Sequence, residues 1–294
     1  MVIVTLQGGL GNQMFQFAVA KHLSLQNSCQ LYLDLSFFSN NTIPNDGFTP
    51  RKYELDIFLK QPLTADYLLS KSFYKKKPLQ NFIKKWLPIE IKSVFNENSL
   101  LFNQSVLNIQ SSVLLNGFFQ SEKYFKSIQA QLFKIFTFPS LPNNTIPPFL
   151  AEIRNTLSVA VHVRRGDFVT SIKTNTYHGV CDTSYYILAM QQIQKKIGSC
   201  KFFFFSDDHD WVKQNLISND STFLVDTANL PSWYDMYLMT QCKHNIIANS
   251  SYSWWGAWLN SNNNKTVIAP KQWFANLDMN SQTSDLIPAE WIKL

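Results

Sequence analysis

Apolar and polar positions alternate in short, well-separated elements from the start of the chain. Val2 to Leu6 is an apolar, β-branched run, and Gly8 to Gly11 interrupts it. Asn12 to Leu25 then places apolar residues near helical spacing, and Gln30 to Asp34 is a short strand that ends in a carboxylate. This order predicts a strand, a glycine loop, a helix and a second strand, which together make a βαβ opening.

The second half of the chain repeats a strand followed by polar residues. Strands are predicted at Ser158 to Val163, Lys201 to Phe205, Thr222 to Asp226, Asn245 to Ala248 and Thr266 to Pro270, with helices over Tyr185 to Lys196, over Tyr234 to Gln241 and through Trp258. Because parallel strands share one carboxyl edge in a doubly wound sheet, we expect the polar residues after these strands to meet in one crevice. Leu114 to Phe119 resembles a late strand of the first half.

A cluster of prolines separates the two halves. Pro139, Pro142, Pro147 and Pro148 surround Asn143 and Asn144 in the clearest linker signal of the sequence. The 294 residues, 45% of them apolar, are enough for two packed domains. We therefore predict domains at residues 1–140 and 151–294.

Composition leads us to expect a cytoplasmic protein. No apolar run approaches the roughly 18 residues that a membrane span needs, and the first residues read as a strand of the fold rather than a signal peptide. The cysteines are scattered without metal or disulfide spacing, which is typical of buried thiols in a reducing compartment.

The net charge of +6 arises in the first half of the chain. Lys71 to Lys92 contains seven lysines against Glu90 alone, interleaved with aromatic residues. Two interpretations stay open: a solvated helical face, or peripheral contact with an anionic membrane on its inner face. Nucleic acid is not expected as a partner, because no recognition motif accompanies the lysines.

Arg164 and Arg165 follow directly after a predicted buried strand. Two adjacent guanidinium groups repel each other, so a phosphate or diphosphate that engages both explains the pair best. The alternative is that one arginine pairs with Asp167 or Asp182 and supports the loop. His162, two residues earlier, is either a core histidine or part of the same site.

Two other polar turns carry candidate chemistry. Asp208, in the run Ser206 to Asp210, can accept hydrogen bonds from a guanine base, or it can join Asp210 in holding a divalent metal. The arginine pair favours guanine and no metal, because it already neutralises phosphate charge. Asn249 to Ser253 offers hydroxyls and helix N-terminal amides to an anion, although the same residues are ordinary helix caps.

The N-terminal glycine loop supports a rival hypothesis. Gly9 and Gly11 match the first two glycines of a dinucleotide fingerprint, Met14 stands where the third should be, and Asp34 follows. An NAD- or flavin-dependent oxidoreductase therefore stays open as an alternative. A non-catalytic glycan-binding protein that uses the tryptophans is a further one.

Four motifs together resemble a known family. Gly8-Gly9-Leu10-Gly11-Asn12-Gln13-Met14-Phe15-Gln16, His162-Val163-Arg164-Arg165-Gly166-Asp167, Phe205-Ser206-Asp207-Asp208 and Asn249-Ser250-Ser251-Tyr252-Ser253-Trp254-Trp255 are similar in order and spacing to bacterial α-1,2-fucosyltransferases of glycosyltransferase family 11. The resemblance implies an α/β, GT-B-like fold of two Rossmann-type domains facing a central cleft. It implies inverting transfer of L-fucose from GDP-β-L-fucose to the 2-hydroxyl of a terminal β-galactose in a glycan such as an O-antigen. A lipid-linked glycan is one form that this acceptor can take.

The resemblance also implies roles for individual residues. The N-terminal domain would take the acceptor and the C-terminal domain the donor. Separately from the resemblance, we expect no cofactor, and the arginine pair leads us to expect no metal. Arg164 and Arg165 would hold the diphosphate and stabilise the leaving group, with Asp167 beside them. Asn12 in the glycine loop would close over the fucose. The remaining donor contacts would come from Gly9, Gly11, His162, Asp208, Ser250, Ser251 and Ser253. For the general base, Asp34, Glu54 and Asp167 stay open.

Overall fold

The computed structural model describes residues 1–39, 51–65, 91–110, 112–140 and 148–294. The chain divides into two compact units. The first comprises Met1–Asn45, Pro50–Thr137 and Ser284–Leu286, and the second includes Phe138–Thr283 and Ile287–Leu294. The lysine-rich segment falls outside the described residues except for its last two positions, and so does most of the predicted linker.

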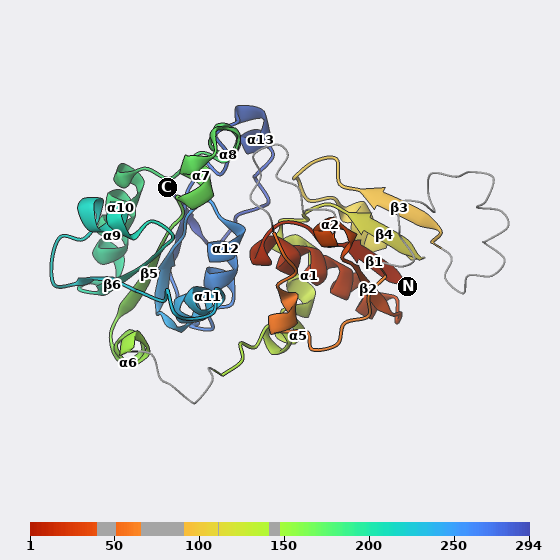
Figure 1. The fold of residues 1–294 in the computed structure, drawn as a ribbon, viewed down its shortest axis with the longest axis horizontal. Coiled ribbons are helices and arrows are strands. Elements are labelled where there is room, and N and C mark those ends of the chain that lie inside the picture. The colour runs from red at the N-terminus through yellow and green to blue at the C-terminus, as the bar shows by residue number, and fades with distance from the viewer. Residues whose placement is uncertain (40–50, 66–90, 111, 141–147) are drawn as a thin grey trace. The chain divides into compact units, whose positions relative to one another are not determined.

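The first unit is built on a parallel sheet of four strands in the order β2-β1-β4-β3 (Figure 1). The strands are β1 (Val2–Thr5), β2 (Leu31–Asp34), β3 (Ser93–Asn96) and β4 (Val113–Asn116). α1 (Leu10–Gln26) connects β1 to β2 and fully buries Met14, Ala18 and Leu23. The predicted βαβ opening is therefore confirmed.

Short helices complete the first unit. They are α2 (Ser36–Ser39), η1 (Leu55–Ile57), η2 (Gln104–Asn108), η3 (Glu122–Tyr124), η4 (Lys126–Ile128) and α5 (Gln129–Ile135). A return segment, Ser284–Leu286, also belongs to this unit. The Asp285 carboxylate accepts from the amide of Phe102 (3.0 Å) and pairs with Lys123, while the Asp285 carbonyl accepts from the buried Ser121 hydroxyl (2.7 Å). A late part of the chain therefore completes the first unit.

The second unit holds a parallel sheet of six strands in the order β10-β9-β8-β5-β6-β7. The strands are β5 (Ser158–Val163), β6 (Lys201–Ser206), β7 (Thr222–Leu224), β8 (His244–Ile246), β9 (Val267–Ala269) and β10 (Ile292–Lys293). Its helices are α6 (Pro148–Asn155), α7 (Gly166–Thr170), α8 (Ile172–His178), α9 (Thr183–Ile197), α10 (His209–Asn215), α11 (Tyr234–Gln241), α12 (Ser251–Trp258) and α13 (Leu277–Ser281). The predicted fold class, α/β and GT-B-like with two Rossmann-type domains, is confirmed in that each unit carries a parallel sheet.

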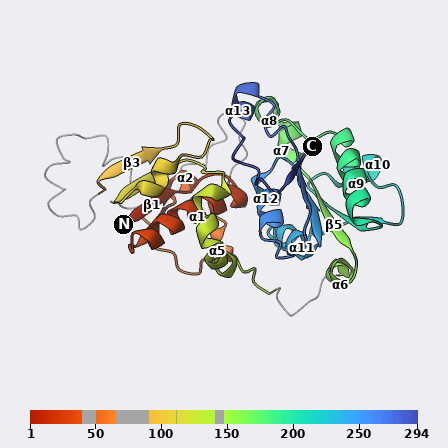
Figure 2. The same cartoon turned by 180° about the vertical axis from the view of Figure 1, so that it is seen from behind.

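The two faces of the second sheet are covered by different helices. Alternate residues of a strand point to opposite faces, and Val159, Val161 and Val163 join one core cluster with residues of α9 and α10. Figures 1 and 2 show α9 and α10 on one side of β5, and α11 and α12 on the other. His162 alternates with these valines along β5, so its side chain points to the opposite face of the sheet, toward α12.

The strand order fixes where a ligand crevice can form. From β5 the chain continues to β6 and β7 on one side, and then returns to β8, β9 and β10 on the other side. The direction reverses between β5 and β8. In open α/β sheets, ligands bind at the carboxyl ends of the strands at such a reversal. Within the described part of the chain, no helix is both long and apolar enough to cross a membrane.

Candidate active site

The polar turns that follow β8, β5 and β6 lie at one edge of the second sheet, because these strands are neighbours and parallel. His162 lies at the end of β5, and its ring contacts that of Tyr252 at the start of α12, with the centroids 5.8 Å apart. Asp207, just beyond β6, contacts Arg164, just beyond β5. The structure thus brings together the three clusters that the sequence analysis expected to meet.

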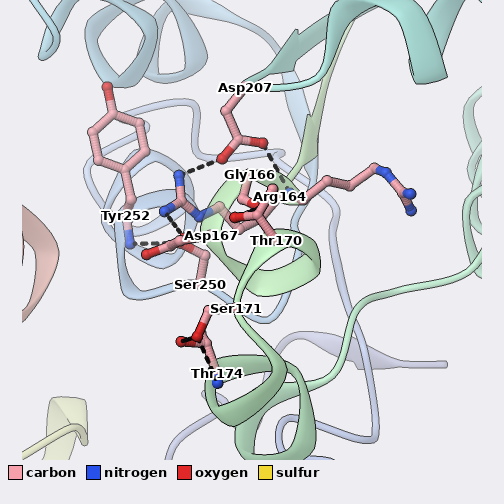
Figure 3. A network of polar contacts seen from close by, with 10 residues as sticks. Arg164, Gly166, Asp167, Thr170, Ser171, Thr174, Asp207, Ser250 and Tyr252 are labelled. Atoms are coloured by element: carbon pink, nitrogen blue, oxygen red, sulfur yellow. Dashed lines mark hydrogen bonds and ion pairs between the residues drawn. The ribbon is translucent and has the colours of Figure 1, made fainter. Parts of the chain in front are cut away.

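Arg164 is held between two carboxylates. One guanidinium nitrogen donates to Asp207 Oδ2 (2.5 Å) and another to Asp167, as Figure 3 shows. The guanidinium also lies over the Phe168 ring, 5.4 Å from its centroid. Asp167 therefore supports the loop, as one sequence alternative proposed, whereas Asp182 accepts from the Tyr185 amide and caps α9. An incoming phosphate has to share Arg164 with these carboxylates.

Arg165 has a different environment. Its Nε donates to Asp208 Oδ2 (3.0 Å), and its guanidinium lies 4.3 Å from the centroid of the Trp211 ring. In the described part of the chain, the two terminal nitrogens of Arg165 have no partner. Stacking on a tryptophan and one hydrogen bond restrict the rotation of the side chain. Arg165 therefore presents a preorganised pair of donors that suits a phosphate.

Asp207 and Gly166 shape the turn that carries both arginines. Asp207 Oδ1 accepts from the amide of Arg165 (2.8 Å), while Oδ2 binds Arg164. A Cβ at Gly166 would lie 2.5 Å from Asp207 Oδ2, so any larger residue would displace this carboxylate. The sequence analysis did not assign a role to Asp207. Its position at a strand end beside an arginine pair was the available signal.

Asp208 already uses both carboxylate oxygens. Oδ1 accepts from the amide of Trp211 (3.1 Å) and so caps α10, and Oδ2 accepts from Arg165. A second carboxylate that the sequence analysis missed is Asp235, at the start of α11. Burial raises the pKa of Asp235. The hydrogen bond that its Oδ1 accepts from Thr227 (2.5 Å) and the nearby His209 oppose that rise. Among the described residues its Oδ2 has no partner.

His162 is almost fully buried, with 7% of its surface exposed. Its Nδ1 has no hydrogen-bond partner among the described residues. Burial lowers the pKa of His162 to about 4, Asp207 opposes that change, and Arg164 adds to it. A neutral imidazole with an unused nitrogen at the reversal between β5 and β8 is a group that a bound ligand can satisfy, since unpaired buried polar atoms are costly.

The turn between β8 and α12 serves mainly the fold. Asn249 donates to the carbonyls of His178 (3.0 Å) and Trp273 (3.1 Å). Ser253 is fully buried and its hydroxyl donates within the turn, to the Ala248 carbonyl (3.3 Å). Ser250 accepts from the Tyr252 amide and caps α12. Ser251, the first residue of α12, is partly exposed and so is placed to meet an anion at the helix N-terminus.

No group of three or more His, Cys, Asp and Glu side chains lies close enough to hold a metal ion in the part of the chain that the structure describes. At this edge of the sheet, the structure places the two cations Arg164 and Arg165, the carboxylates Asp167, Asp207 and Asp208, and His162.

The sequence pattern of glycosyl transferase family 11 matches residues 1–294. The chain belongs to this family. An α-1,2-colitosyltransferase of Escherichia coli is 34% identical, with 100% of this chain and 98% of that protein aligned. The O-antigen biosynthesis glycosyltransferase WbnK of Escherichia coli is 32% identical, with 98% and 99% aligned. The human galactoside alpha-(1,2)-fucosyltransferase 1 is 28% identical over 49% of this chain and 42% of its own length.

In this family 11 glycosyltransferase, other residues of the same chain bind the N-terminal glycine loop and the start of α1. Gly8 has a φ of +76°, and the first amide of α1, from Leu10, donates to Glu54 Oε2 (3.1 Å). Gln13 joins the loop to the following segment, donating to the carbonyls of Gly8 (2.9 Å) and Lys52 (2.8 Å). A carboxylate therefore lies where a dinucleotide fold would bind pyrophosphate. This leaves the oxidoreductase hypothesis without support.

The three carboxylates considered as general base all have protein partners. Asp34 is 4% exposed and accepts from the amide of Ser36 (3.0 Å). Glu54 caps α1, and Asp167 pairs with Arg164. Asn12, predicted to close over the fucose, has its Oδ1 bonded to the Gln120 amide (2.8 Å). None of these contacts singles out one carboxylate as the base.

Proposed function

We propose that this glycosyltransferase transfers a 6-deoxy-L-hexose from its GDP derivative to the 2-hydroxyl of a terminal β-galactose, with inversion at the anomeric carbon. The observation that carries the proposal is the pair Arg164 and Arg165 beside a neutral His162 whose Nδ1 has no hydrogen-bond partner among the described residues, all at the reversal of the second sheet. The arginines are cationic donors that suit a diphosphate, and the neutral histidine can hydrogen-bond the nucleoside.

The two arginines have separate roles in this proposal. Arg165 presents two terminal nitrogens to the diphosphate and stabilises the negative charge that grows on GDP as the glycosidic bond breaks. Arg164, neutralised by Asp167 and Asp207, fixes the turn and shares a phosphate contact. Ser250 and Ser251 add the N-terminus of α12, and His162 contacts the ribose or base. Gly9, Gly11 and Asn12 belong to the acceptor-side unit.

For guanine recognition, two carboxylates compete. Asp208 is the residue predicted from the sequence, but both its oxygens already accept hydrogen bonds. Asp235 is partly buried and, among described residues, keeps one oxygen unused. A guanine donates two parallel N–H groups, so it needs a carboxylate with capacity to accept. Comparing GDP with IDP, which lacks the exocyclic amine, in Asp235→Asn and Asp208→Asn variants identifies the carboxylate.

The sugar of the donor is either L-fucose or colitose. The alignment with the human galactoside fucosyltransferase favours fucose, and the longer, 34% identical alignment with the colitosyltransferase favours colitose. Colitose lacks the 3-hydroxyl of fucose. A site that hydrogen-bonds this hydroxyl rejects the deoxy sugar by about 10⁴-fold, whereas an apolar contact discriminates far less. We propose GDP-β-L-fucose as the donor and GDP-colitose as the second candidate.

The test is a competition between the two donors. The purified protein is incubated with GDP-fucose and GDP-colitose, a panel of β-galactosides is offered, and the linkage of the product is determined by NMR. Transfer of fucose at a higher kcat/KM supports the proposal. Preferential transfer of colitose would mean that GDP-colitose, and not GDP-fucose, is the donor. Transfer to another hydroxyl, or of neither sugar, contradicts the proposed function.

The same assay tests the metal. We propose that the reaction needs no divalent cation, because Arg164 and Arg165 supply positive charge to the diphosphate. Activity should persist in EDTA, and a loss that manganese or magnesium restores would contradict this.

A surface polysaccharide such as an O-antigen is the acceptor class proposed here, supported by the similarity to WbnK. Lipid linkage of that acceptor and membrane contact through the lysines stay predictions.

A further inference from the structure

The carboxyl edge of the first sheet carries a continuous row of polar side chains. The row consists of the last residue of each of the four strands: Asp34 of β2, Thr5 of β1, Asn116 of β4 and Asn96 of β3. The Thr5 hydroxyl lies 3.0 Å from Asp34 Oδ2 and 2.7 Å from Asn116 Oδ1, and Asn116 Nδ2 donates to Asn96 Oδ1 (3.0 Å). We call these four residues the edge row.

The register of the sheet produces this row. Thr5 is aligned with Asp34, and Asn96 with Asn116, so the side chains at these positions project from the same level of neighbouring strands. The strand order β2-β1-β4-β3 also reverses direction between β1 and β4. Thr5 and Asn116 lie at the carboxyl ends of those two strands. The centre of the edge row is therefore the place where an α/β sheet forms a ligand crevice.

Much of the hydrogen-bonding capacity of the edge row is unused. Each primary amide has two N–H donors and a carbonyl acceptor. Among the described residues, Asn116 uses one donor and its acceptor, and the exposed Asn96 uses only its acceptor. A second amide pair, Asn12 and Gln120, follows β1 and β4 on the same edge and also keeps N–H groups without a protein partner in the described chain.

The chemistry of the edge row differs from that of the arginine site. Its exposed member, Asn96, and the partly exposed Asn116 are neutral amides, its one carboxylate, Asp34, is 4% exposed, and none of its four residues is a cation. Amides donate and accept in one plane, which suits the neighbouring hydroxyls of a sugar ring, whereas a phosphate needs positive charge. We propose that the edge row is a binding subsite for the neutral glycan acceptor, with Asn96 and Asn116 contacting its hydroxyls. This inference rests on the proposed function.

The test measures acceptor and nucleotide binding separately. Lactose serves as the β-galactoside probe in ligand-detected NMR, and GDP binding is measured by calorimetry. Asn96→Ala and Asn116→Ser should each weaken lactose binding up to about tenfold, as expected for the loss of one hydrogen bond, and should leave GDP binding unchanged. Ser93→Ala, at the exposed opposite end of β3, is the matched control and should bind lactose like the parent.

Kinetics provide a second readout for the same variants. The KM for the galactoside should rise while the KM for the GDP-sugar and the slow hydrolysis of that donor stay at parent values. The inference is overturned if the parent does not bind lactose, if lactose binding survives both substitutions, or if GDP binding falls in parallel. Failure of the proposed function is a different result: GDP-sugars are not turned over, whatever the lactose titration shows.

Discussion

At the scale of single residues, the two adjacent arginines are not equivalent. Arg164 is enclosed by Asp167 and Asp207, whereas Arg165 is stacked on Trp211 with its terminal nitrogens facing no partner in the described chain. Two guanidinium groups in sequence would repel each other if both were exposed. Surrounding one with carboxylates lowers that repulsion and leaves the other to act on a ligand.

Arg165→Ala should therefore reduce kcat by about 10²-fold or more, the usual cost of removing one preorganised donor to developing charge. Arg165→Lys should recover little, because lysine lacks the planar group that stacks on Trp211 and binds two phosphate oxygens. Steady-state kinetics with a soluble galactoside measure both variants. Arg154→Ala, an arginine of α6 that bonds to Gln241 and Tyr237, is the control. Parent-like turnover in Arg165→Ala would assign this arginine to the fold alone.

His162 should make stability depend on pH. Its pKa is lowered from 6.5 to about 4 by burial, so between these values the unfolded chain binds a proton that the folded protein does not. Stability from this group is complete above pH 6.5 and falls as the pH drops toward 4. At about 1.4 kcal/mol per pKa unit, the loss amounts to a few kcal/mol.

Urea unfolding at pH 7, 5.5 and 4.5 measures that loss. His162→Gln, which cannot be protonated in this range, should unfold with a shallower dependence on pH than the parent. The groups that face His162 and remain in the variant are Asp207, Arg164 and Tyr252. Equal slopes for parent and variant would show that the buried histidine does not govern acid sensitivity.

At the scale of elements, the site depends on how strands end. β5 runs directly into α7, and Gly166 begins that helix without a Cβ, which leaves room for Asp207 from the end of β6. The same carboxylate then bonds both to the backbone and to the side chain of the arginine pair. One glycine and one aspartate thus couple two neighbouring strand ends.

Gly166→Ala should destabilise the protein by about 1–3 kcal/mol, the typical cost of overpacking a tight contact, and should lower transfer activity by displacing Asp207. In an Asp207→Ala background the same glycine substitution should cost much less, because the clashing carboxylate is gone. Thermal unfolding of the two single variants and the double variant measures this coupling. Thr170→Ala, in the same helix, is the control. Additive effects would rule out the proposed clash.

The sequence identifies elements that are buried and misses those that are not. β5 and β6 are nearly continuous apolar runs because helices cover both faces of their sheet. β3 is largely exposed, and β10 has two residues, so neither shows a clear pattern. For the site, the motifs and the parallel topology place His162, Arg164 and Asp208 at one edge. Which carboxylate each arginine binds depends on contacts between distant residues, such as Arg164 with Asp207, and no local pattern encodes these.

At the scale of the whole molecule, the two units are not two contiguous halves of the chain. Phe138–Thr283 belongs to the second unit, and the next three residues, Ser284–Leu286, belong to the first. Leu286 is 1% exposed there. A boundary drawn from composition alone, between residues 140 and 151, cannot detect such a return, because three residues carry no compositional signal.

Asp285→Ala should therefore destabilise the first unit, although residue 285 lies near the C-terminus. The substitution leaves the amide of Phe102 without its acceptor, at a cost of about 1–3 kcal/mol. Asp285→Asn should cost less, because an amide oxygen can still accept that bond. The ion pair that it loses involves Lys123, which is 54% exposed, and so contributes at most about 1 kcal/mol.

Asp278→Ala, at an exposed position of α13, is the control. Urea unfolding should rank the parent and control as most stable, then Asp285→Asn, then Asp285→Ala, and hydrogen exchange should locate the loss in the first unit, around Phe102 and Ser121. Parent-like exchange there in Asp285→Ala would mean that the return segment does not stabilise the first unit.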